Sequence, residues 1–354
     1  TNLSKPTVSS LVDELIVNKY LIDCGTVASQ QMGRRPNELR VNGTENLVAV
    51  ISWRRARLDI ALITADNKIA FRDQIPLTEE EDKVDKITST FFNIMKPKVG
   101  DRRIMGLCII IPGIIDAENK RILSTVIGVG YSDPVVQRFE EAFHDYPFCL
   151  LNDTACFAYA EYVFANITEP NFAYINVSKG VGACLFANGK MLRGAGSNAT
   201  QFGHFSVDRN GPLCACGNHG CVERVVGENA LTERAEACGI DLTRFAGRKP
   251  LYCDIGAMAE DGDAHAKELI KDLAVDLSFA ISNLITLFNP SLVVIGGMGV
   301  NLGPFFLSNI RDEVQNSGFK EFVSNTWIQY STLGLDSELG GAARYYIDHY
   351  YDFF

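Results

Sequence analysis

One stretch of the chain is especially rich in chemical groups: Gly203-His204, nine further residues, then Cys214-Ala215-Cys216-Gly217-Asn218-His219-Gly220-Cys221-Val222-Glu223. Three thiolates and one imidazole can fill a closed tetrahedral zinc site, which leaves no open position for catalysis. Glycines after Cys216 let the loop fold back and bring Cys221 to the other ligands. We therefore predict a structural Zn²⁺ ion held by His204, Cys214, Cys216 and Cys221.

Other interpretations of this stretch stay open. His219 lies in the same loop and could replace His204 as the fourth ligand. The thiols could also be an unrelated cluster, or a redox switch that needs no metal. Most other cysteines stand singly in apolar runs, so we predict reduced thiols in the core. These are Cys108, Cys149, Cys156 and Cys184.

The composition bounds the class of protein. The chain has 354 residues, of which 47% are hydrophobic and 21% charged, as in a globular protein of two or three domains. No apolar run approaches the roughly 18 residues of a membrane span, and no signal peptide is visible. Together with the reduced thiols, these features predict a cytoplasmic protein. The net charge of −10 argues against a chain that is basic throughout and binds nucleic acid with all of its surface.

Strand-like and helix-like patterns alternate from about residue 46 onward. Strands are expected at 47–51, 58–63, 105–112, 149–151, 172–177, 182–186 and 292–295, and helices at 133–144, 154–164 and 264–288. The run at 105–112 is continuously apolar, which is typical of a strand buried on both faces. This alternation predicts an α/β fold with two similar lobes and a cleft between them.

The first 44 residues differ from the rest and predict a DNA-binding head. Ser4 can cap a helix, and Pro6 fits the first helical turn. Strand-like pieces at 20–22 and 39–41 enclose a polar loop that ends Gly33-Arg34-Arg35-Pro36. This order is typical of a winged helix-turn-helix whose first helices precede residue 1. The expected DNA contacts are Ser4, Lys5, Thr7, Ser9, Ser10, Arg34 and Arg35.

The alternative interpretation of the head is purely structural: an amphipathic helix and a hairpin with no role in DNA binding. The distribution of charge favours DNA binding by the head alone. Residues 1–44 hold five basic and four acidic side chains, a net of +1, so the other 310 residues carry −11. Such an acidic body would repel DNA.

Several motifs resemble the ROK family (repressors, open reading frames and sugar kinases). The Gly-His and Cys-x-Cys-Gly-x-x-Gly-Cys-x-Glu spacing resembles the signature of that family. The segments 112–116, 152–153, 293–297 and 339–343 resemble its Pro-Gly-x-Val-Asp segment, its catalytic Asn-Asp pair, its adenosine-side loop and the start of its C-terminal helix. A winged helix-turn-helix in front of these motifs is what the repressor branch carries and the kinases lack.

The resemblance implies a two-lobed sugar-kinase/actin-like (ROK) fold of the α/β class, preceded by a partial winged helix-turn-helix. The expected domains are the head at 1–44, lobe I at 45–150 plus 336–354, and lobe II with the zinc loop at 151–335. The resemblance also implies that Asn152, Asp153, Gln201, His204 and Glu223 face a sugar. In a kinase Asp153 would be the general base, whereas the plainer role for it is a helix N-cap.

Departures from the family pattern separate its branches. Kinases of the family need Asp-x-Gly-x-Thr where this chain has Ser52-Trp53-Arg54-Arg55-Ala56, and Gly-Thr-Gly where it has Ser178-Lys179-Gly180. Bulky side chains prevent the close approach of backbone to phosphate that glycine allows. Gln201 replaces a glutamate of the family, and 124–128 matches its Pro-Asn turn poorly, so the identity of the sugar is left open. We expect no kinase activity, with Asp153 as the relic of a base.

These features predict a sugar-responsive transcriptional regulator that represses its genes. It would bind operator DNA as a dimer, or as a tetramer built from dimers, because paired half-sites multiply specificity. A small carbohydrate effector would bind in the cleft between the lobes. One alternative is an ATP-dependent ROK sugar kinase with an appended head, and another is a scaffold for a protein partner.

Overall fold

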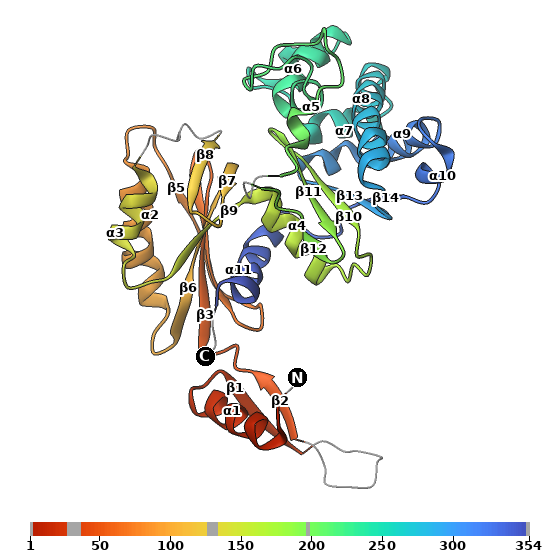
Figure 1. Ribbon diagram of the computed structural model, residues 1–354. Helices are drawn as coiled ribbons and strands as arrows, with labels where there is room; N and C mark the ends of the chain where they lie inside the picture. Colours follow the sequence, from red (N-terminus) through yellow and green to blue (C-terminus); the bar gives the residue numbers. More distant parts are fainter. Residues whose placement is uncertain (1–2, 27–36, 126–133, 196–198, 352–354) are drawn as a thin grey trace. The chain divides into compact units, whose positions relative to one another are not determined.

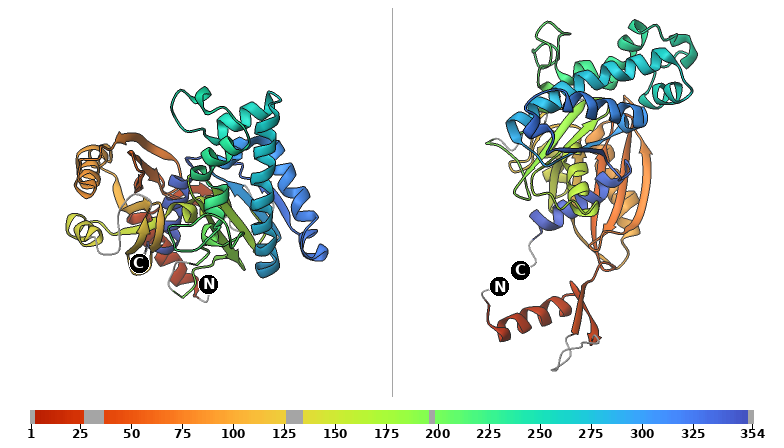
Figure 2. Two further views of the ribbon diagram at one scale, coloured as in Figure 1. Left: turned by 90° about the horizontal axis from the view of Figure 1, so that it is seen from above. Right: turned by 90° about the vertical axis from the view of Figure 1, so that its right-hand side faces the viewer.

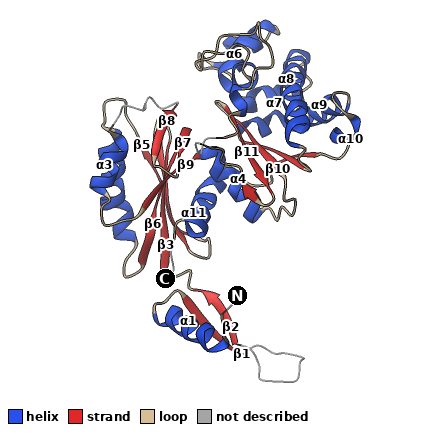
Figure 3. Ribbon diagram, in the orientation of Figure 1, coloured by secondary structure: helices blue, strands red, loops and turns tan. Residues whose placement is uncertain are grey.

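The computed structural model describes residues 3–26, 37–125, 134–195 and 199–351. The chain divides into two compact units, unit 1 (Thr1–Ala160 and Glu338–Phe354) and unit 2 (Glu161–Ser337). Each unit contains one five-stranded sheet with helices on it (Figures 1 and 3). The predicted α/β class is therefore confirmed. Among the described residues, no helix combines the length and the apolar character needed to cross a membrane.

The large sheet of unit 1 begins directly after the head. Its strands are β3 (Asn46–Trp53), β4 (Arg57–Thr64), β5 (Ile69–Pro76), β6 (Arg103–Ile111) and β9 (Phe148–Asn152). They lie in the order β5-β4-β3-β6-β9, with β3, β6 and β9 parallel and β4 antiparallel to both of its neighbours. All but the first two residues of β6 are buried, as the apolar run predicts. A small hairpin, β7 (Gly113–Asp116) with β8 (Arg121–Thr125), follows β6.

Helices cover both faces of this sheet. On one face, α2 (Lys83–Thr90), the helical turns η1 (Phe91–Met95) and η2 (Lys96–Lys98) that follow it, and α3 (Val135–Ala142) are gathered (Figure 1). Phe91 and Phe139 pack there in one core with Leu107. On the other face lies α11 (Ser337–His349), where the thiol of Cys108 donates to the Ala342 carbonyl at 3.5 Å. The alternation of side chains along β6 therefore supplies both cores.

The head consists of α1 (Lys5–Val17) and the antiparallel pair β1 (Leu21–Thr26) and β2 (Asn37–Val41). Ser4 caps α1, because its hydroxyl oxygen accepts a hydrogen bond from the Thr7 amide at 3.4 Å, and Pro6 lies in the first turn. The predicted helix and both predicted strands are confirmed. The loop between the strands falls at 27–36, so Arg34 and Arg35 lie outside the described residues.

The sheet of unit 2 contains β10 (Phe172–Val177), β11 (Val181–Ala187), β12 (Lys190–Met191), β13 (Leu292–Gly296) and β14 (Trp327–Tyr330). Their order is β12-β11-β10-β13-β14. Six α-helices accompany the sheet: α5 (Val222–Val226), α6 (Glu228–Ala237), α7 (Tyr252–Glu260), α8 (Ala264–Phe288), α9 (Gly303–Gln315) and α10 (Lys320–Val323). The 3-10 turns are η3 (Phe202–His204), η4 (Leu242–Phe245) and η5 (Met298–Leu302).

The long helix α8 forms much of the core of unit 2 (Figure 2). It ends as the sequence predicts, because Asn289 adopts the left-handed conformation (φ 49°) that terminates a helix before Pro290. Helix α4 (Asp153–Phe164) carries the chain from unit 1 into unit 2. The predicted helix at 154–164 and the predicted strands at 172–177 and 182–186 are confirmed.

Candidate metal and effector sites

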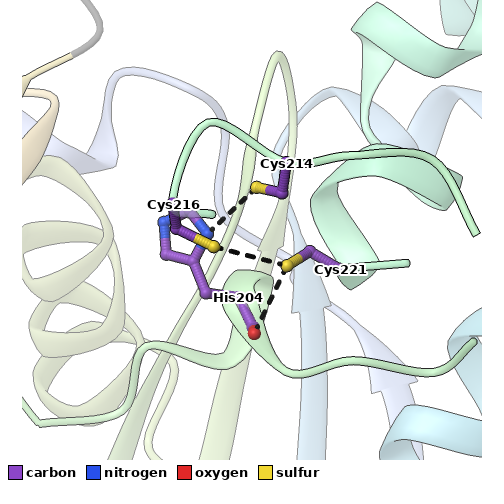
Figure 4. Close-up of side chains that lie close together, drawn as sticks. All are labelled: His204, Cys214, Cys216 and Cys221. Carbon is purple, nitrogen blue, oxygen red and sulfur yellow. Dashed lines mark hydrogen bonds between the residues drawn. The ribbon is translucent and has the colours of Figure 1, made fainter. Parts of the chain in front are cut away.

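The loop before α5 brings one imidazole and three thiols together (Figure 4). The possible ligand atoms of His204, Cys214, Cys216 and Cys221 all lie within 4.8 Å of one another. The Cys214 sulfur lies 3.6 Å from Nδ1 of His204, and the sulfurs of Cys216 and Cys221 are 3.6 Å apart. Two thiolates about 2.3 Å from a tetrahedral zinc ion lie roughly 3.8 Å apart, so these four residues fit zinc.

Backbone turns place these ligands. The amide of Cys214 donates to the Asn218 carbonyl at 2.8 Å, which closes the turn that holds Cys214 and Cys216. Gly220 has a positive φ of 59°, and a Cβ there would lie 1.8 Å from the Asp208 carbonyl oxygen. Only glycine fits this close approach, which leads the chain back to Cys221.

The other histidine of the loop lies apart from this cluster. Nδ1 of His219 is 3.0 Å from the Gly211 carbonyl oxygen, and the side chain is exposed. Burial raises the pKa of the Cys221 thiol to about 12, whereas hydrogen bonding to the Asn218 backbone lowers the pKa of Cys216. A divalent cation would offset the cost of the buried thiolate at Cys221.

Asn152 and Asp153 stand where β9 meets α4. The Asn152 side chain accepts a hydrogen bond from the Ala155 amide at 3.0 Å, so Asn152 caps the helix. Its Nδ2 donates to the Gly113 carbonyl at 2.6 Å. The carboxylate of Asp153 accepts a hydrogen bond from the Thr154 amide at 2.8 Å. Both side chains are therefore held in fixed positions, with some hydrogen-bonding capacity left for another partner.

A half-buried guanidinium group lies among three carboxylates at the turn between β3 and β4. Arg54 Nη2 is 2.5 Å from Glu338 Oε1, Nε is 3.6 Å from Asp59 Oδ2, and Nη1 is 3.9 Å from Asp153 Oδ2. Burial raises the pKa of Glu338 to about 7, and it also raises the pKa of Asp153, in each case against the attraction of Arg54. The charge of Arg54 thus partly compensates for the burial of these acids.

The turn from β10 to β11 is closed by its own contacts. The Ser178 hydroxyl donates to Asn176 Oδ1 at 2.9 Å and accepts from the Met298 amide at 3.2 Å. Met298 begins η5, directly after the 293–297 segment. The Ser178 hydroxyl therefore links the loop at 178–180 to the loop at 293–297. Both loops correspond to nucleotide-binding segments of the ROK kinases.

Glu223, Gln201 and His204 lie in unit 2. Glu223 Oε2 accepts a hydrogen bond from the Val181 amide at 3.4 Å, and a Cβ on Gly180 would lie 2.3 Å from that oxygen. Gln201 and His204 line a mainly apolar pocket of about 400 Å³. Its other walls come from β11, the residues around η3 and the last turns of α8: Ala183, Leu185, Thr200, Phe202, Phe205, Ala280, Asn283, Leu284, Leu287 and Phe288.

The described part of the predicted DNA-contacting set lies on α1 and its cap. Lys5, Thr7, Ser9 and Ser10 are exposed, and so is Ser4. The hydroxyls of Ser4 and Thr7 are 2.8 Å apart and share a hydrogen bond. Three of the half-buried residues of the helix are Leu11, Leu15 and Ile16, so its polar side is free to meet another molecule.

The sequence does not indicate that Glu338 and Asp59 join the Arg54 cluster, nor that the hydroxyls of Tyr20 and Tyr351 lie 2.7 Å apart and share a hydrogen bond. The local signal for Glu338 is an acidic residue in the first turn of a helix. A charged residue there also suits an exposed helix N-terminus, so this signal does not indicate burial.

Comparison with known proteins extends these observations. The profile of the ROK family matches residues 52–348. The xylose repressor of Bacillus subtilis (strain 168) is 26% identical over 360 residues, which cover 99% of this chain and 90% of the repressor. The DNA-binding transcriptional dual regulator NagC of Escherichia coli (strain K12) is 26% identical over 356 residues, 97% of this chain and 86% of NagC.

Solved structures share the fold. A ROK family transcriptional regulator, a homologue of the E. coli MLC protein, superposes with a TM-score of 0.81 and 23% identity, covering 97% of this chain and 88% of its own. A ROK family glucokinase from Streptomyces griseus, in complex with glucose and AMPPNP, has a TM-score of 0.69 and 22% identity. That match covers 84% of this chain and 98% of the kinase.

Proposed function

This chain belongs to the ROK family, and we propose that it is a sugar-responsive transcriptional repressor. Its head binds operator DNA, and the rest of the chain binds a small carbohydrate effector. The observation that carries this proposal is the share of this chain that each relative matches. The repressors and the regulator match 97–99% of the chain, whereas the glucokinase matches 84% of it. The family profile likewise begins only at residue 52.

We propose that the polar side of α1 contacts the operator. Lysine and hydroxyl side chains suit phosphate and base-edge contacts, and Ser4, Thr7 and Lys5 are exposed together on the first turns. We also propose that Arg34 and Arg35 are wing residues that contact phosphates or the minor groove. A single head contacts few base pairs, so the repressor acts as a dimer on paired half-sites.

The effector is proposed to contact Asn152, Asp153, Gln201, His204 and Glu223. Carboxylates and amides can each hydrogen-bond to neighbouring hydroxyl groups of a sugar. The fixed positions of Asn152 and Glu223 support this, because preorganised polar groups lose little entropy on binding. The names of the relatives point to different sugars, xylose and N-acetylglucosamine, so the proposal covers the class of ligand only.

A kinase reaction is not part of the proposal. Arg54 Nη1 lies 3.9 Å from Asp153 Oδ2, so the guanidinium competes for the lone pairs with which Asp153 would accept a proton as a base. The Ser178 hydroxyl is already committed to Asn176 and Met298. These contacts replace the open, glycine-rich turns that phosphate binding needs.

We further propose that zinc is bound by His204, Cys214, Cys216 and Cys221. All four ligand positions come from the protein, so the ion would stabilise the loop and would not activate a substrate. His204 would use Nδ1 toward the metal, the ring nitrogen that lies near Cys214. The loop leads into α5, which carries Glu223, so its order would also position an effector-binding residue.

The proposal is tested with the full chain in two steps. A thermal-shift screen against pentoses, hexoses, N-acetylhexosamines and their phosphates identifies stabilising ligands, because a ligand that binds only the native state raises its stability. Selection from a random duplex pool then yields an operator. We expect to select a sequence for which the affinity of the chain changes when the stabilising sugar is added. Selective DNA binding that no sugar changes would contradict the proposal. Sugar binding by a chain that selects no DNA sequence would contradict it as well.

A further inference from the structure

One helix of unit 1 contacts both the Arg54 cluster and the head. Glu338, in the first turn of α11, is 2.5 Å from Arg54, which also lies near Asp153. Tyr351, two residues beyond the end of α11, shares a hydrogen bond with the Tyr20 hydroxyl at 2.7 Å. The 13 residues of α11 span about 20 Å, so one element bridges these two distant places.

We infer that α11 couples the effector-binding residues to the DNA-binding head. An effector hydroxyl that hydrogen-bonds to Asp153 changes how strongly Asp153 attracts Arg54. Arg54 then shifts relative to Glu338, α11 moves, and Tyr351 carries the displacement to Tyr20. This inference rests on the proposed function only for what binds at each end, because the contacts themselves belong to unit 1 alone.

The Arg54 end of the helix is sensitive to such a change. Glu338 is 1% exposed, and its Oε2 has no hydrogen-bond partner among the described residues. Arg54 is therefore its main source of electrostatic compensation, and that cation is shared with Asp59 and Asp153. In a buried cluster, a new hydrogen bond at one acid alters the balance at the others.

The middle of α11 is packed too closely to bend easily. A Cβ on Gly341 would lie 2.1 Å from the Cys156 carbonyl oxygen of α4. The Ala342 carbonyl accepts the thiol of Cys108, and the Tyr346 hydroxyl donates to the Met105 carbonyl at 3.1 Å. Closely packed elements tend to shift as bodies between discrete arrangements, which suits a helix that transmits movement along its axis.

The Tyr20 end is attached directly to the helix that is proposed to contact DNA. The Tyr20 amide donates to the Leu15 carbonyl at 2.8 Å, which closes the end of α1. The Tyr20 ring also packs edge-on against Tyr351, with 6.0 Å between ring centroids, and Arg103 lies 4.8 Å from its centroid. The end of α11 points toward the head in Figure 1 and in the right view of Figure 2. A displaced Tyr351 would therefore move the last turn of α1.

Hydrogen–deuterium exchange of the full chain tests the coupling without sugar or DNA. We expect Glu338→Gln to speed amide exchange in 5–26 by roughly fivefold or more, the lower end of ordinary coupling between sites. In a Tyr351→Ala background the same substitution should leave exchange in 5–26 unchanged. Lys86→Gln is the control, because Lys86 pairs with Glu81 in unit 1 and with no member of the Arg54 cluster.

Two results would overturn the inference. In the first, Glu338→Gln changes amide exchange only near the Arg54 cluster. In the second, it changes exchange in 5–26 equally in the wild-type and the Tyr351→Ala backgrounds. Unchanged exchange in β6, which lies in the core of unit 1, verifies that the variant folds. Arg54→Lys, which keeps the charge but loses the forked geometry, provides a second perturbation. Because the readout needs neither ligand, a failed sugar or operator screen leaves this result intact.

Discussion

Arg54 and Glu338, separated by 284 positions in the sequence, form a contact of 2.5 Å between Nη2 of the half-buried arginine and Oε1 of the buried glutamate. The pair joins the turn after the first strand of the large sheet to the first turn of the last helix. It also brings a cation to Asp153, the residue that resembles the base of the family's kinases. This single arrangement bears on stability, on the predicted lack of kinase activity and on the proposed coupling.

Replacing Arg54 with Gln should destabilise unit 1 by about 3 kcal/mol, because removal of one partner leaves a buried charge unpaired. Urea denaturation at pH 7.5 measures the change in the free energy of unfolding. Arg57→Gln, which removes a half-exposed guanidinium from the same turn, should cost about 1 kcal/mol or less. Equal losses for the two variants would show that burial of the Arg54 pair has no special role.

The pH dependence of stability should reveal Glu338. Its folded-state pKa of about 7 lies above the ordinary value of 4.5, so the folded chain binds the extra proton between these values. This contribution is complete below about pH 4.5 and is lost as the pH rises through 7, an effect of about 3 kcal/mol. Wild type should therefore lose more unfolding free energy than Glu338→Gln between pH 4.5 and 7.5. Parallel profiles for the two proteins would contradict this.

Cys216→Ser should lower both the zinc content and the affinity for the selected operator. Loss of one of four ligands weakens a structural zinc site strongly, and the loop leads directly into the helix of Glu223. Elemental analysis and a DNA-binding titration check the two effects. Cys253→Ser, which removes another exposed thiol outside the cluster, should change neither. Full operator binding by a zinc-free Cys216→Ser protein would contradict the structural role of the ion.

Lys5→Gln should weaken binding to all duplexes by a similar factor and reduce the slope of log affinity against log salt by about 1. The reason is the loss of one cation that displaces a counterion from the phosphates. Fluorescence anisotropy at several salt concentrations measures the slope. Lys68→Gln is the control, because Lys68 pairs with Asp66 at 2.8 Å on the body. A slope unchanged by Lys5→Gln would place the DNA contact elsewhere.

With Mg²⁺ and ATP, no sugar in the panel should increase ATP consumption by the full chain. The reason is that Arg54 and Ser178 lie in the turns where a phosphate would bind, and their side chains already contact Glu338 and Met298. A coupled assay with a ROK glucokinase as positive control measures this. Sugar-dependent turnover that disappears in Asp153→Asn would instead support the kinase alternative.

Local patterns in the sequence determined much of this protein. Apolar periodicity predicted strands such as β6 and the long helix α8, because burial repeats at the period of each element. Ser4, Pro6 and Asn289 predicted where helices begin or end, because caps are formed by neighbours in the chain. The spacing of the cysteines predicted the thiol cluster for the same reason, since three of its members lie within eight residues.

Only the tertiary structure decided the long-range contacts. Arg54 is one of several cations in its turn, and nothing near it in sequence shows that it would reach Asp153 and Glu338. Tyr20 and Tyr351 are 331 positions apart, yet their hydroxyls meet. Such pairs depend on the path of the whole chain, because α11 returns to the sheet that the first strands began. Local sequence therefore determined the elements and the loop of the thiol cluster, whereas folding decided which charges and rings meet.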